Sequence, residues 1–160
     1  MSIEEIAQSD VGVRSPTGLS QIVEILIRTG RMAEGLAVLK RMEQLEAGCY
    51  TPEVLRLKGE LCLLHCTPGA ADTAKDHFQQ ALDEARRRRT LAWELRAATS
   101  LARLPRDQGR PTVATACLRP IYHSFTEGFA TGDLIAAKQL LDDLARLIHE
   151  HSRDSLADVV

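Results

Sequence analysis

The chain has 160 residues, of which 44% are hydrophobic but only 4% aromatic, so its apolar mass consists mainly of short aliphatic side chains. The 20 alanines and 22 leucines predict an all-α fold around a single core. With a formal net charge of −2 the chain has no global field for holding nucleic acid, and no apolar run approaches the roughly 20 residues that cross a bilayer. Neither nucleic acid nor a membrane is therefore expected as a partner, and an acidic start without an apolar signal segment indicates a cytoplasmic protein.

The first predicted helix begins near Leu19, after an N-terminal segment, residues 1–16, that we expect to be partly flexible. Apolar side chains cover most of the circumference of this helix. Either the N-terminal segment folds back over it, or another protein covers it. The side chains expected at this contact are Ile22, Val23, Ile25, Leu26 and Ile27.

Three later segments, which begin at Gly30, Gly69 and Gly109, align without gaps at spacings of 39 and 40 residues. In each segment a small, a bulky and an apolar residue follow the glycine at the same positions. We expect each glycine to end one helix in a left-handed turn, and the small residue to let the next helix approach its neighbour closely. The aligned sets are Gly30, Gly35, Leu39, Met42; Gly69, Ala74, Phe78, Ala81; and Gly109, Ala114, Leu118, Ile121.

A helix is predicted before each of these glycines, so the repeated unit is a helical hairpin. Gly59 and Ala97 occupy equivalent positions in the second and third of these helices, where a small residue suits a helix crossing. Pro105 predicts that the third helix kinks or ends near Leu104. A last helix, from about residue 131 to 150, has an apolar stripe and a polar outer side that are typical of a capping helix, and residues 151–160 are predicted to form a polar tail.

The second hairpin resembles the tetratricopeptide pattern of small, small, aromatic and small residues. Its residues are Gly59, Ala74, Phe78 and Ala81. The period of 39 to 40 residues is longer than the usual repeat of ~34. The longer unit is similar to the variant found in large bacterial signalling ATPases.

Four blocks of the chain resemble, in the same order, the C-terminal helical repeats of bacterial proteins that join an adenylate/guanylate cyclase or a transcriptional-regulator domain to a STAND-type AAA ATPase. The blocks are residues 52–64, 74–86, 93–110 and 120–144. This resemblance implies a tetratricopeptide-like right-handed superhelix of about three hairpins plus a C-terminal capping helix, over residues 17–150. It also implies a scaffolding or sensing role in bacterial signalling or transcriptional regulation.

In that geometry the first helix of each hairpin lines a concave groove, which suits a peptide or a helix of another protein. The groove residues expected from the second and third hairpins are Glu53, Arg56, Glu60, Leu63, Glu94 and Leu101. We therefore expect a non-catalytic module that binds a protein partner or a second copy of itself as a homodimer. A domain that senses a small molecule in the groove is the alternative.

No catalytic, cofactor or metal site is expected from the sequence, which contains no phosphate-binding loop. The most metal-like group is Cys62, His65 and Cys66, but on a helix His65 points away from the two cysteines, so we interpret them as buried apolar residues. The run Arg86 to Arg89 is interpreted as cations that stabilise a helix C-terminus. A basic spot for an acidic partner, or a grip for phosphate or RNA, is the alternative for this run.

Overall fold

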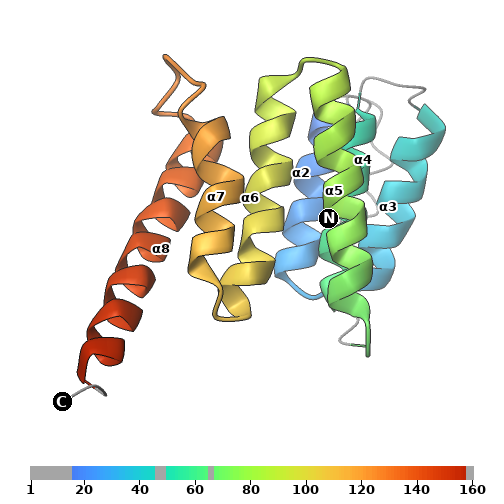
Figure 1. Ribbon diagram of the computed structural model, residues 1–160. Coiled ribbons are helices and arrows are strands. Elements are labelled where there is room, and N and C mark those ends of the chain that lie inside the picture. Colours follow the sequence, from blue (N-terminus) through green and yellow to red (C-terminus); the bar gives the residue numbers. More distant parts are fainter. Residues whose placement is uncertain (1–15, 46–49, 65–66, 158–160) are drawn as a thin grey trace. The chain divides into compact units, whose positions relative to one another are not determined.

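The computed structural model describes residues 16–45, 50–64 and 67–157, and within these ranges all regular structure is helical (Figure 1). The predicted all-α fold is therefore confirmed. The helices are α2 (Pro16–Arg28), α3 (Met32–Leu45), α4 (Thr51–Leu64), α5 (Ala70–Arg87), α6 (Leu91–Asp107), α7 (Pro111–Tyr122) and α8 (Gly132–Ala157). Over the described ranges, none of these helices combines the length and apolar character needed to cross a bilayer.

The chain divides into two compact units, residues 1–84 and residues 85–160, with the boundary inside α5. In unit 1 the hairpin of α2 and α3 contacts α4, which touches both of them. In unit 2 the hairpin of α6 and α7 contacts α8 in the same way, and these three helices lie side by side (Figure 1). Each unit thus contains a helical hairpin with a third helix against both of its members.

The three repeated glycines have the left-handed conformation that their spacing in the sequence predicts. Gly30, Gly69 and Gly109 have φ angles of +71°, +84° and +69°, a conformation that glycine adopts without a steric penalty. After α6 the N–H of Gly109 donates to the carbonyl of Arg106 at 3.0 Å, and the N–H of Arg110 donates to the carbonyl of Pro105 at 2.8 Å. These two bonds form a Schellman motif, which satisfies carbonyls at the helix end and reverses the chain.

Two helix ends differ from the sequence prediction. The helix α6 does not end near Leu104 but continues through Pro105 to Asp107, because proline in the last turn removes one backbone hydrogen bond without ending the helix. A kink at Pro105, the other predicted outcome, stays a prediction. The helix α8 continues to Ala157, so that residues 151–157 of the predicted tail are helical. Residues 1–15 of the predicted N-terminal segment and residues 158–160 lie outside the described residues.

The core of each unit consists of small and aliphatic side chains packed at helix crossings. In unit 1 the largest of the fully buried side chains is Phe78 of α5, and its ring lies directly against Gly59 of α4. A Cβ atom on Gly59 would lie 2.4 Å from Cε1 of Phe78. The predicted close approach at this small residue is therefore confirmed. In unit 2 the equivalent positions are held by Ala97 and Leu118, which are also buried.

We expect Gly59→Ala to lower the free energy of unfolding by about 1–3 kcal/mol, because the added methyl group overlaps the ring of Phe78 and forces it to move. Urea denaturation measures this change. The double variant Gly59→Ala with Phe78→Leu should recover part of the loss, because leucine leaves room for the methyl group. Unit 2 has this combination of residues, with Ala97 on α6 and Leu118 on α7.

The matched control is Gly132→Ala at the start of α8, where an added Cβ meets no atom within 4 Å. This change should be neutral or stabilise the protein by up to about 1 kcal/mol, because alanine favours the helix more than glycine does. Equal effects of Gly59→Ala and Gly132→Ala would contradict the close packing at Gly59.

Candidate functional site

A cluster of charged side chains lies between α2 and α4 in unit 1. Both nitrogens on one edge of the Arg56 guanidinium bind Glu53, with Nε to Oε2 at 2.9 Å and Nη2 to Oε1 at 2.7 Å. The hydroxyl of Ser20 on α2 donates to Oε1 of Glu53 at 2.9 Å. Glu53 is 1% exposed and Arg56 is 6% exposed, so this bidentate ion pair is in the interior of the unit.

Arg56 also connects α4 to the partly exposed edge of α2. Its Nη2 lies 2.5 Å from Oε1 of Glu24, and its Nη1 lies 3.4 Å from Oε1 of Glu60. Burial alone would lower the pKa of Arg56, but the hydrogen bonds and charge of Glu53, with the charges of Glu24 and Glu60, raise this pKa above its ordinary value. Arg56 therefore keeps its positive charge and compensates the buried carboxylate of Glu53.

The predicted groove residues differ in how deeply the structure buries them. Glu53 and Arg56 are buried and join two helices, so they do not offer their charges to a ligand in solvent. This corrects their expected place on a groove surface. The remaining predicted groove residues are partly buried: Glu60, Leu63, Glu94 and Leu101.

The apolar residues predicted on the first helix are covered to different degrees by unit 1 itself. Val23 and Leu26 are fully buried in its core, where they pack with residues of α3 and α4. Ile22 and Ile27 are partly buried against that core. Ile25 is 50% exposed, so it presents apolar surface that the described residues of the unit leave uncovered on this helix.

The cysteines considered as metal ligands are described only in part. Cys62 is a free, partly buried thiol in α4. The other members of the predicted group, His65 and Cys66, lie outside the described residues. Over the described ranges, no three histidine, cysteine or acidic side chains gather in a metal-binding arrangement.

In unit 2, arginines pair with carboxylates at the start of α6 and of α8. Arg86 at the end of α5 binds Glu94 of α6, with Nε 2.8 Å from Oε1. Arg96 binds Asp133 of α8 at 2.9 Å, and its guanidinium lies over the ring of Trp93 at 5.6 Å. A salt bridge thus links the first and third helices of unit 2, as the Arg56 cluster does in unit 1.

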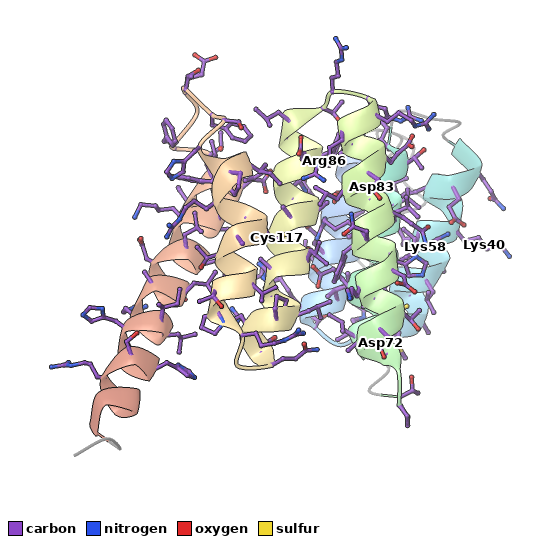
Figure 2. The ribbon with its side chains drawn as sticks, viewed as in Figure 1. Lys40, Lys58, Asp72, Asp83, Arg86 and Cys117 are labelled. Atoms are coloured by element: carbon purple, nitrogen blue, oxygen red, sulfur yellow. The ribbon has the colours of Figure 1, made fainter. Side chains whose placement is uncertain are left out.

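Cys117 lies on α7 in the field of Arg86, and both are labelled in Figure 2. Burial raises the pKa of this thiol above its ordinary value, and the positive charge of Arg86 offsets part of that rise. Cys117 is therefore mainly a neutral thiol near pH 7, and such a thiol is a poor nucleophile.

Comparisons with known proteins identify no relative of this chain. No family model matches the chain, and no curated protein or solved structure matches it significantly.

We expect Arg56→Met to lower the free energy of unfolding by about 3–5 kcal/mol, because it leaves the carboxylate of Glu53 buried without its compensating charge. Lys58→Met on the same helix is the control. Lys58 pairs with Glu43 at a partly exposed site, so its loss should cost no more than about 1 kcal/mol. Denaturation of the two variants side by side tests this, and similar small losses would contradict a structural role for the buried pair.

Cys117 should react more slowly with iodoacetamide in the folded protein at neutral pH than in the urea-unfolded chain, since burial favours its neutral form. Mass spectrometry of the peptide that contains Cys117 separates it from the other cysteines. The rate should increase with pH through a pKa above the value in the unfolded chain, and Arg86→Gln should raise that pKa further. A pKa in the folded protein below that of the unfolded chain would contradict the predicted direction.

Proposed function

We propose that this protein is a non-catalytic, tetratricopeptide-like helical-repeat module that binds protein, either a partner or a second copy of itself. The observation that carries the proposal is the repeated local arrangement, in which a hairpin closed by a left-handed glycine contacts a third helix in both units. Proteins built from such repeats present extended surfaces for other proteins. The resemblance of the sequence to repeat regions of bacterial ATPases favours a cytoplasmic role in signalling or transcriptional regulation.

Exposed aliphatic side chains in unit 1 supply a contact surface of the kind that this function needs. Ile25 on α2 is 50% exposed, and Leu36 on α3 is 45% exposed. Covering each of them would contribute about 1 kcal/mol. Because association costs at least about 4 kcal/mol in lost motion, a partner has to cover further surface around these two residues.

The burial of Glu53 and Arg56 weakens the alternative, a small-molecule site in the predicted groove. A site for a polar small molecule needs a few charged or polar groups that face the ligand. In unit 1 two of the three charged groups of the predicted groove, Glu53 and Arg56, are engaged with each other and with α2 instead. Small-molecule sensing therefore has less support than protein binding.

For the homodimer, we expect Ile25→Glu to convert the dimer to a monomer, because a carboxylate cannot be buried in an apolar contact without a partner. Light scattering coupled to gel filtration, over a range of protein concentrations, measures the mass. Ile25 is half-exposed, so the substitution should leave the helical content and the melting temperature of the monomer nearly unchanged.

Gln80→Glu is the matched control, because it adds the same charge at an exposed position on α5, away from the face of α2 that carries Ile25. This variant should remain a dimer. A wild-type chain that is monomeric at every concentration contradicts self-association and leaves binding to a different protein as the proposed function. Pull-down experiments with Ile25→Glu and Gln80→Glu then compare the two variants for that partner.

A further inference from the structure

Positive charge is concentrated in one part of a chain that is acidic elsewhere. Residues 85–130 contain nine arginines and no lysine against three carboxylates, a formal charge of +6. Residues 1–84 carry eight basic and thirteen acidic side chains, a formal charge of −5. Residues 131–160 carry three basic and six acidic side chains, a formal charge of −3. The overall charge of −2 therefore conceals a strongly basic segment in unit 2.

Five of these arginines gather at one end of unit 2, because the turn from α5 to α6 and the loop from α7 to α8 lie at the same end (Figure 1). This arginine end consists of Arg86, Arg87, Arg88, Arg89 and Arg119. All of them except Arg88 are exposed. Arg86 is paired with Glu94, whereas among the described residues the side chains of Arg89 and Arg119 form no ion pair.

The backbone of Arg89 has a strained, left-handed conformation. Its φ angle is +55°, and among the described non-glycine residues it alone has a positive φ. The N–H of Arg89 donates to Arg86 and that of Thr90 donates to Ala85, each at 3.0 Å, in the same Schellman pattern that Gly109 forms after α6. Glycine would suit this backbone better than arginine does, so the turn itself gives no reason for a cationic side chain.

Apolar side chains accompany the arginines at the same end. The rings of Tyr122, the last residue of α7, and Phe129 in the following loop are 5.9 Å apart. Phe129 is 48% exposed, and Ile135 in the first turns of α8 is 43% exposed. The exposed carboxylate of Glu127 lies in the same loop, so the basic surface ends there.

We infer that the arginine end of unit 2 binds an acidic segment of a partner protein, one that carries Asp or Glu together with a few apolar side chains. This inference rests on the proposed protein-binding function and specifies the chemistry of the partner. Guanidinium groups pair with carboxylates in bidentate geometry, and exposed Phe129 and Ile135 offer apolar contacts beside them.

A long nucleic acid fits this surface less well than a short acidic protein segment does. Residues 131–160, which follow the basic segment in unit 2, carry a charge of −3 and would repel a polyanion that extends from the arginine end along α8. Exposed acidic side chains also precede the arginines on α5, with Asp83 one turn before Arg87. A base can stack on the exposed ring of Phe129, but Ile135 has no ring and suits an aliphatic side chain of a protein, such as leucine or isoleucine.

The probe is a fluorescein-labelled peptide of about 12 residues, rich in Glu and Asp and with two leucines, whose binding is followed by fluorescence anisotropy at low and high salt. The full chain should bind it, more weakly at high salt. Arg87→Glu with Arg119→Glu should weaken binding about tenfold or more, because two attractions become repulsions. The matched control, Lys40→Glu with Lys75→Glu, makes the same change in net charge at exposed sites in unit 1 and should change binding less than about twofold.

Arg89→Gly separates a binding role from a structural one. Removing the strained side chain should raise the melting temperature, because glycine adopts positive φ freely, and should also weaken peptide binding about threefold. Arg89→Lys keeps both the charge and the strain, so its melting temperature and affinity should stay near those of the wild type. A role in folding alone would leave peptide binding by Arg89→Gly unchanged.

Three results would overturn the inference: no binding of the acidic peptide, equal losses in the arginine and lysine variants, or tighter binding of a single-stranded oligonucleotide of the same charge. The dimer test with Ile25→Glu uses a different surface in unit 1. If that test succeeds while the acidic peptide fails, the inference is wrong and the proposed protein-binding function stands.

Discussion

Each hairpin forms because a residue between two helices adopts a positive φ and reverses the chain within a few residues. Gly30, Gly69 and Gly109 do this between successive helices. An isolated helix of 12 to 18 residues is marginal in water, so α2 through α7 need the apolar face of a neighbour. The left-handed turn brings that neighbour into place, and close packing at small residues such as Gly59 follows from it.

Much of this architecture can be predicted from the sequence, because the signals involved are local and specific to residue type. Glycine at a fixed spacing indicates positive φ, and small residues at equivalent helix positions indicate close crossings. Arg89 adopts the same left-handed conformation without such a signal, since arginine rarely does so. The extension of α8 to Ala157 is not predictable from polarity, because polar residues continue a solvated helix as readily as they form a tail.

The buried ion pair shows where prediction from local pattern ends. Glu53 and Arg56, three residues apart on a helix, have the spacing of an ordinary surface salt bridge. Their burial depends on Ser20 and Glu24, which lie 33 and 32 residues away in the sequence. Only the packing of α2 against α4 brings these four side chains together, and no repeat or spacing in the sequence indicates it. The same holds for Arg96 and Asp133, 37 residues apart in unit 2.

The Arg56 cluster also bears on how the correct helices find one another. Chains of similar hairpins are prone to incorrect pairing, because one helix can replace another in the array. Residue 94 is the sequence equivalent of residue 56, so α2 packed against α6 in place of α4 would set Glu24 opposite Glu94 instead of Arg56. Two carboxylates would then repel each other where attraction is required. A misassembled chain would therefore be penalised at the contact that stabilises the native one.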